Sequence, residues 1–276
     1  MDEIAQMMVL IRRCNFATYQ TPRSDPDMPR ERRARELLDF AAAFGLDHCE
    51  HHRSADDDGV VALEVAQDPA RTGYIPYTDR PLKWHTDGYY NAIGTPVRAF
   101  LLHCARDAAI GGESAVLDPE IAYIRLRDAN PRHIAALMHH EAMTIPANVE
   151  PDGSVRPART GPVFSVDPPD ATLHMRYTAR GRNIVWRDDS DTRAAVDFLN
   201  RMLDGDEPLI HRLKLAPGQG ILCNNVLHKR SGFSQGASAH HRRLLNRIRF
   251  HDRISRPDEA AKQSAHEKED LAPWQN

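Results

Sequence analysis

The sequence predicts a mainly β fold, a sandwich or a barrel, with a few helices inserted between short strands. Short apolar segments rich in β-branched and aromatic residues recur from residue 97 onward. Glycine turns such as Gly111-Gly112 separate several of them, and the chain has no glycine-rich phosphate loop of the kind found in doubly wound sheets. With 276 residues, the chain is expected to form a single domain, 1–276.

The first third of the chain mixes helix and loop. The first 30 residues end in a Pro- and Asp-rich loop, and the core is expected over about 30–251. Residues 30–45 predict an amphipathic helix, with apolar side chains near one face and Gly45 as its C-terminal cap. A polar loop at 47–59 and a strand at 60–68 follow.

The remainder alternates strands with short helices. Asp118-Pro119 and Asn130-Pro131 each place a capping residue before proline, which predicts helices at about 119–128 and 131–141. A third helix follows, capped by Ser190 or Asp191 and closed by Gly205. Strands are expected at 97–104, 113–118, 161–166, 172–177, 182–186, 210–215, 221–228 and 243–250, and residues 252–276 form a surface tail.

Composition narrows the class of protein. The hydrophobic fraction is 41 %, the charged fraction 27 % and the net charge −3, so we expect neither nucleic acid nor an anionic membrane as a partner. The four cysteines form no CxxC pair, the N-terminus has no apolar signal region, and no apolar run approaches the ~18 residues of a membrane span. These features predict reduced thiols in a cytoplasmic protein.

The segment WHTDG at 84–88 raises the question of a metal site. On a strand, residues i and i+2 point to the same face, so His85 and Asp87 can reach one ion. Among 15 histidines such spacings also arise by chance. Two others are His48/Glu50 in a polar loop and His139/Glu141 in a predicted helix, where i and i+2 diverge by about 200°. The triplet alone leaves both interpretations open.

Residues 218–250 favour the metal interpretation. His228 ends a predicted strand, and after a connection over 229–242 the last strand begins at Arg243. Its period of two places Arg243 and Arg247 on one face, and a guanidinium is well suited to bind a carboxylate. The alternative is an edge strand with solvated arginines, which leaves the order of His, strand and Arg unexplained.

The segments WHTDG (84–88), GGESAV (111–116), NNVLHKRSGF (224–233) and RRLLNR (242–247) together resemble the TauD/TfdA family of Fe(II)/2-oxoglutarate-dependent dioxygenases, which includes γ-butyrobetaine hydroxylase-like enzymes. The resemblance implies a double-stranded β-helix (jelly-roll) core with flanking helices. It implies that His85, Asp87 and His228 bind iron, and that Arg243 and Ser114 bind the distal carboxylate of 2-oxoglutarate. Ser114 replaces the usual Thr, and LHKR replaces the commoner LHGR.

The resemblance also implies a reaction. Fe(II), 2-oxoglutarate and O₂ would hydroxylate an aliphatic carbon of a small molecule, with release of succinate and CO₂. Halogenases of this superfamily lack the metal carboxylate, so Asp87 favours hydroxylation, although desaturation would use the same ligands. Arg247, Tyr89, Tyr90 and Arg176 are the candidate substrate contacts, and the arginines favour a substrate with a carboxylate or sulfonate. A homo-oligomer is compatible with the resemblance.

Other functions use the same residues. Trp84, Tyr177 and Trp186 either form an aromatic surface with Tyr89 and Tyr90 or lie in the core, and the core is favoured for the two tryptophans. One alternative function is a non-catalytic jelly-roll protein that binds a small molecule. Another is a zinc-dependent hydrolase with the same His/Asp/His set, which would not need Arg243 and Ser114 to bind a carboxylate.

Overall fold

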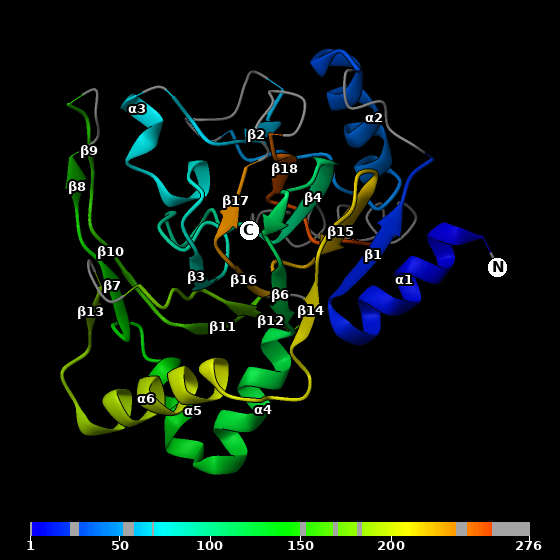
Figure 1. Cartoon of the computed structure of the whole chain (residues 1–276). Coiled ribbons are helices and arrows are strands. Elements are labelled where there is room, and N and C mark those ends of the chain that lie inside the picture. The colour runs from blue at the N-terminus through cyan, green and yellow to red at the C-terminus, as the bar shows by residue number, and fades with distance from the viewer. Residues whose placement is uncertain are drawn as a thin grey trace, which may run out of the picture.

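Two antiparallel β-sheets face each other in the computed structural model, which describes residues 2–22, 28–51, 58–67, 69–149, 153–167, 171–180, 184–235 and 242–255 (Figure 1). The larger sheet has the order β1 (Phe16–Gln20), β15 (Gln219–Cys223), β4 (Ala99–Arg106), β18 (Leu244–Phe250) and β2 (Val61–Leu63). The smaller has the order β14 (His211–Leu213), β6 (Ser114–Leu117), β16 (Leu227–Arg230) and β3 (Leu82–His85). The predicted mainly β architecture is confirmed.

A buried apolar cluster joins the inner faces of these two sheets. Phe100, Ile221 and Leu245 from the larger sheet pack with Val116 from the smaller one. Alternate residues of β18 face opposite ways, because side chains of a strand alternate. Leu245 therefore points inward, whereas Ile248 and Phe250 join a second cluster on the outer face.

Two N-terminal helices cover that outer face (Figure 1). Met8 and Ile11 of α1 (Glu3–Cys14) and Leu37 of α2 (Arg30–Ala42) pack in the outer cluster. Strand β1 then pairs with β15, with Phe16 opposite Cys223. The residues before position 30, outside the predicted core of 30–251, thus supply a helix and the edge strand of the larger sheet.

A second helical layer comprises α4 (Pro119–Ala129), α5 (Pro131–Leu137) and α6 (Ser190–Asp204), grouped at the lower end in Figure 1. As predicted, Asp118 and Asn130 cap the first two helices, each accepting a backbone N–H bond. Two boundaries differ from the prediction. Helix α5 ends at Leu137 rather than 141, and Asp189 caps α6 through bonds from two backbone N–H groups.

Short elements complete the chain around the sheets. Strands β7 (Met143–Ile145), β10 (Arg159–Gly161) and β13 (Val185–Trp186) form a three-stranded sheet. Three two-stranded pairs are β8 (Asn148–Val149) with β9 (Val155–Arg156), β11 (Phe164–Asp167) with β12 (Thr172–Met175), and β5 (Ile110–Gly111) with β17 (Phe233–Ser234). Helix α3 (Pro69–Thr72) and a 3₁₀ turn (Ile75–Tyr77) precede β3.

The described part of the predicted tail is packed onto the core. Ile254 belongs to the outer apolar cluster, and the backbone N–H of Ser255 donates to the carbonyl of Phe44 at 3.0 Å. Residues 256–276 lie outside the described residues. Among the described helices, none has the length and apolarity needed to cross a membrane. All four cysteines are free thiols.

Candidate metal centre and its surrounding cavity

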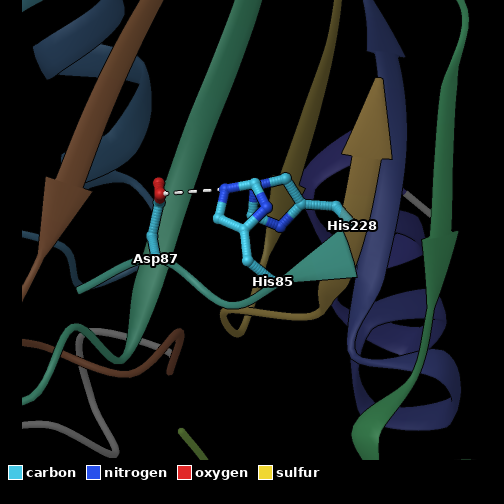
Figure 2. A group of neighbouring side chains, drawn as sticks. All are labelled: His85, Asp87 and His228. Carbon is cyan, nitrogen blue, oxygen red and sulfur yellow. Dashed lines mark ion pairs between the residues drawn. The ribbon is translucent and has the colours of Figure 1, made fainter. Parts of the chain in front are cut away.

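The three predicted iron ligands come together on two paired strands. His85 is the last residue of β3, Asp87 follows two positions later, and His228 lies opposite His85 on β16. One potential ligand atom from each side chain lies within 4.8 Å of the others, and His85 Nε2 is 3.8 Å from Asp87 Oδ1 (Figure 2). His228 is the second residue of a new strand rather than the end of the preceding one, because Asn225, with φ 47°, turns the chain between β15 and β16.

Backbone carbonyls fix the orientation of both imidazoles. His85 Nδ1 donates to the carbonyl of Lys83, and His228 Nδ1 donates to the carbonyl of Val226, each at 2.9 Å. A carbonyl only accepts, so the proton is on Nδ1 and the Nε2 lone pair is available to a metal. Burial, with His228 nearby, lowers the pKa of His85 to about 3, and burial also lowers the pKa of His228. Both rings are therefore neutral at pH 7, the form that binds metals.

Asp87 provides the negative charge of the site. Burial by itself raises the pKa of a carboxyl group, but Arg247 and Arg249 outweigh it and hold the pKa of Asp87 well below its usual range. Arg247 Nη1 lies 3.2 Å from Oδ1. Oδ2 is buried and has no hydrogen-bond partner within the described part of the chain. Two neutral imidazoles and a carboxylate with an unused oxygen fit a divalent ion such as Fe(II) or Zn(II).

Asn225 supports the ligand set, a role that sequence reasoning missed. Its Oδ1 accepts from the backbone N–H of Asp87 at 2.8 Å, and its Nδ2 donates to the carbonyl of Asp87 at 3.0 Å. One amide side chain thus binds both backbone groups of a metal-ligand residue. The available signal was the position of Asn225 three residues before His228 in NNVLH.

Glycines are required where the metal motif and the Gly-Gly turn approach other segments. Gly88 has φ +68°, and a Cβ there would lie 2.5 Å from Val97 Cγ2. Gly111 has φ +72°, and a Cβ there would lie 2.3 Å from the carbonyl oxygen of Gly232. Any other residue would be strained at these positions and would collide with the neighbouring segment.

Arg243 and Ser114 line one small buried cavity with Gly112. Arg243 is 4 % exposed, and its guanidinium lies over the ring of Phe233 at 4.9 Å. Within the described residues it has no acidic partner, and desolvation lowers the pKa of Arg243 to about 10. A buried cation without a counter-ion is unfavourable, so this position favours binding of an anion. The cavity measures about 10 Å³, so a carboxylate would fit only after the lining side chains shift.

Tyr89 and Tyr90 line a large cavity that also includes His85 and Asp87. The ring of Tyr89 stands edge-on to His85, with centroids 6.4 Å apart. Tyr90 belongs to a buried polar network, in which its hydroxyl accepts from Arg249 Nη1 at 2.8 Å. Arg249 Nη2 is 2.5 Å from Glu50 Oε2, and this network is a further feature that sequence reasoning missed.

Arg247 and Arg249 both line the same cavity as the tyrosines. Arg243, Arg247 and Arg249 are each at most 7 % exposed. These three arginines therefore point into the molecule rather than forming a basic surface. The predicted period of two along this strand agrees with that placement.

Arg176 is not placed as the sequence predicted. Its guanidinium is buried away from the cavity lining and donates to four backbone carbonyls. These belong to Tyr89 at 2.8 Å, Met143 at 3.1 Å, Gly161 at 3.4 Å and Arg159 at 2.8 Å. Arg176 thus holds together the segments that form the cavity wall, and it does not line the cavity in which a substrate contact was predicted for it.

The other aromatic candidates lie in the core. Trp84 is 2 % exposed and its Nε1 donates to the carbonyl of Leu203 at 2.8 Å. Tyr177 is fully buried and its hydroxyl donates to Asn200 at 2.6 Å. Trp186 packs partly buried against the same cluster. None of the three lines the large cavity, so an aromatic surface that includes them is excluded.

The two other His-x-acid triplets differ from the metal centre. His48 Nδ1 pairs with Asp252 at 2.7 Å, whereas Glu50 pairs with Arg249, so these two side chains serve different partners. His139 lies after the end of α5, which corrects the prediction that helical geometry separates it from Glu141. His139, His140 and Glu141 do cluster within 4.8 Å, on the surface.

Comparison with known sequences identifies the family. The profile described as taurine catabolism dioxygenase TauD, TfdA family matches residues 27–248. The chain belongs to the TauD/TfdA family. A uridine-5'-phosphate dioxygenase from Amycolatopsis sp. is 30 % identical over 146 residues, 51 % of this chain and 50 % of that protein. The chain thus matches about half the length of this curated relative.

Solved structures of iron oxygenases share the fold of this TauD/TfdA protein. An asparagine oxygenase in complex with Fe(II), 3-hydroxyasparagine and succinate has a TM-score of 0.62 and 14 % identity, over 90 % of this chain and 77 % of that one. OrfP in complex with Fe and alpha-ketoglutaric acid has a TM-score of 0.63 and 17 % identity, over 94 % and 81 %. PvcB from Pseudomonas aeruginosa has a TM-score of 0.57 and 17 % identity, over 92 % and 82 %. The predicted jelly-roll fold is confirmed.

Proposed function

We propose that this protein is an Fe(II)- and 2-oxoglutarate-dependent oxygenase that hydroxylates an aliphatic carbon of a small anionic substrate and releases succinate and CO₂. One observation carries the proposal. In a TauD/TfdA chain, two neutral imidazoles and a buried carboxylate oxygen without a partner converge at the wall of a large cavity. That donor set suits the two-histidine, one-carboxylate binding of non-haem iron.

His85, Asp87 and His228 would hold the iron. When bound, iron together with 2-oxoglutarate and O₂ supplies the oxidising power that converts a C–H bond into C–OH. The chain's own contribution is orientation: the carbonyls of Lys83 and Val226 set both imidazoles, and Asn225 sets the backbone of Asp87. Such supporting contacts position ligands before the metal binds.

Arg243 and Ser114 would bind the distal carboxylate of 2-oxoglutarate. The buried guanidinium lacks a counter-ion within the described residues, and a carboxylate would neutralise it and accept from the Ser114 hydroxyl. Gly112 supports this assignment: a Cβ there would be 3.5 Å from Arg243 Nε, so glycine leaves room for the guanidinium. A zinc hydrolase or a simple binding protein would have no use for a buried arginine in this position.

Arg247, Tyr89 and Tyr90 would contact the substrate, since all three line the cavity beside Asp87. Arg247 favours a substrate with an anionic group, and the sequence favours a carboxylate or a sulfonate. The names and ligands of the relatives include amino acids and a nucleotide. We therefore extend the proposal only to a small molecule that carries at least one anionic group.

Titration of the apoprotein without oxygen tests the function. Fe(II) and then 2-oxoglutarate are added while the weak visible charge-transfer band of the Fe(II)–keto acid chelate is recorded. The band is expected in the wild type, and its loss is expected in His228→Ala and Arg243→Ala. Arg127→Ala, an exposed arginine paired only with Asp128, is the matched control and should retain it. If Fe(II) binds but no band appears, the assignment of 2-oxoglutarate as co-substrate is rejected. The zinc-hydrolase and binding-protein alternatives would then have to be considered again.

The remaining expectations are part of the same proposal. The four free thiols fit a reducing compartment, so we place the protein in the cytoplasm. We also propose that residues 1–276 act as a single oxygenase domain and that copies of the chain associate as a homo-oligomer. Size-exclusion chromatography with light scattering measures the number of copies.

A further inference from the structure

The cavity beside the candidate metal centre is larger than a small metabolite needs. Its volume is about 2340 Å³, whereas small-molecule pockets usually measure about 300–1,000 Å³. It extends from His85 and Asp87 to Arg156 on β9 and Arg159 on β10. A substrate can therefore hold one carbon at the metal and a second polar group farther along this wall.

Four of the arginines that line this cavity fall into two groups. Near the metal, Arg247 is paired with Asp87 at 3.2 Å and Arg249 with Glu50 at 2.5 Å, so a carboxylate already neutralises each. Farther out, Arg159 and Arg180 are half-buried and line the cavity. Within the described part of the chain, neither side chain forms a hydrogen bond or an ion pair. Among the described residues, no carboxylate is paired with either of these two positive charges.

Both arginines belong to the same section of wall. The guanidinium of Arg180 lies over the ring of Tyr89, 5.8 Å from its centroid, and that ring stands edge-on to His85. The buried guanidinium of Arg176 donates to the carbonyls of Tyr89 and Arg159, each at 2.8 Å. One side chain thus holds the backbones of Tyr89 and Arg159 near each other, and Tyr89, Arg159 and Arg180 all line the same cavity.

We propose that Arg159 and Arg180 form a phosphate-binding subsite, and that the substrate is a phosphate monoester whose reacting carbon lies at the metal centre. The inference rests on the proposed oxygenase function and deepens it. A phosphate monoester carries about −1.5 to −2 charges at pH 7 and three acceptor oxygens, which two guanidinium groups match in charge and in donors. A carboxylate or a sulfonate carries one charge and would leave one of the two arginines uncompensated.

Calorimetric titration of the protein loaded with Fe(II) and 2-oxoglutarate, without oxygen, tests the subsite. Phenyl phosphate is the probe, and benzenesulfonate and benzoate are its singly charged analogues. Phenyl phosphate is expected to bind at least about tenfold more tightly than either analogue. Arg159→Gln and Arg180→Gln should each weaken the binding of phenyl phosphate by about tenfold or more. Arg127→Gln, a change at an exposed arginine, should leave the affinity for phenyl phosphate unchanged.

The charge-transfer band separates the two proposals. Retention of the band in both glutamine variants shows that they fold and hold iron and 2-oxoglutarate. If the band forms but phenyl phosphate does not bind, or binds no better than benzenesulfonate, the phosphate subsite is rejected and the oxygenase function stands. An unchanged affinity for phenyl phosphate in both glutamine variants also rejects the phosphate subsite. If no band forms in the wild type, the oxygenase function itself fails, whatever the calorimetry shows.

Discussion

Replacing Arg176 by methionine tests the most specific disagreement between sequence and structure. The sequence places Arg176 among the substrate contacts, whereas the structure makes it a buried donor to four backbone carbonyls. Three of these bonds are 3.1 Å or shorter. At about 1.5 kcal/mol net for each bond from a charged donor, the loss of these three bonds costs about 4 to 5 kcal/mol. Methionine is apolar and similar in volume to arginine, so the volume change adds little.

Urea unfolding of the apoprotein, followed by circular dichroism, measures this cost. A loss of about 4 to 5 kcal/mol is a large part of the 5–15 kcal/mol that stabilises a typical domain. Arg127→Met is the matched control and should change the free energy of unfolding by less than about 0.5 kcal/mol, because Arg127 is exposed and paired only with Asp128. An unchanged stability in Arg176→Met, together with a raised KM for substrate, would restore the substrate-contact interpretation and refute the structural one.

Three other variants test separate parts of the architecture. Asn225→Ala should weaken Fe(II) affinity about tenfold in competition with a chelator, because it frees both backbone groups of Asp87; unchanged affinity would show that Asn225 does not position the ligand. Burial lowers the pKa of His103 from 6.5 to about 4, so the folded state binds fewer protons and wild-type stability falls as pH drops from 6.5 to 4. In His103→Gln, the loss of unfolding free energy between pH 6.5 and 4, measured with urea, should be about 3 kcal/mol smaller than in the wild type. A loss equal to that of the wild type would contradict the assignment. Gly111→Ala should lower the melting temperature by several degrees, because the added Cβ would lie 2.3 Å from the carbonyl oxygen of Gly232. An unchanged melting temperature would contradict this predicted clash.

The features that the sequence predicted well depend on local periodicity or on fixed motifs. The i, i+2 spacing of His85 and Asp87 and the alternation along β18 are strand properties, so they could be deduced before the structure was known. The prolines after Asp118 and Asn130 gave the starts of two helices for the same local reason. Resemblance to a family then supplied His228 and Arg243, which no local rule connects.

The features that were missed depend on contacts between distant segments. Arg176 and Arg247 are both predicted as substrate contacts, and only the packing of the strands turns one toward carbonyls and the other toward the cavity. Asn225 reaches Asp87 across 138 positions. The acidic run before α6 offers several acceptors, and only the backbone geometry selects Asp189 as the cap.

The position of β18 has a consequence for the order in which the protein matures. This strand lies between β4 and β2 in the larger sheet, yet it is the last strand described in the chain. During synthesis the larger sheet therefore stays open between β4 and β2 until β18 arrives, and the unpaired edges can pair with other chains. The same strand carries Arg247 and follows directly after Arg243. A chain cut short before residue 243 would retain the three candidate iron ligands but lose both arginines, so the proposed binding of the co-substrate by Arg243 depends on completion of the fold.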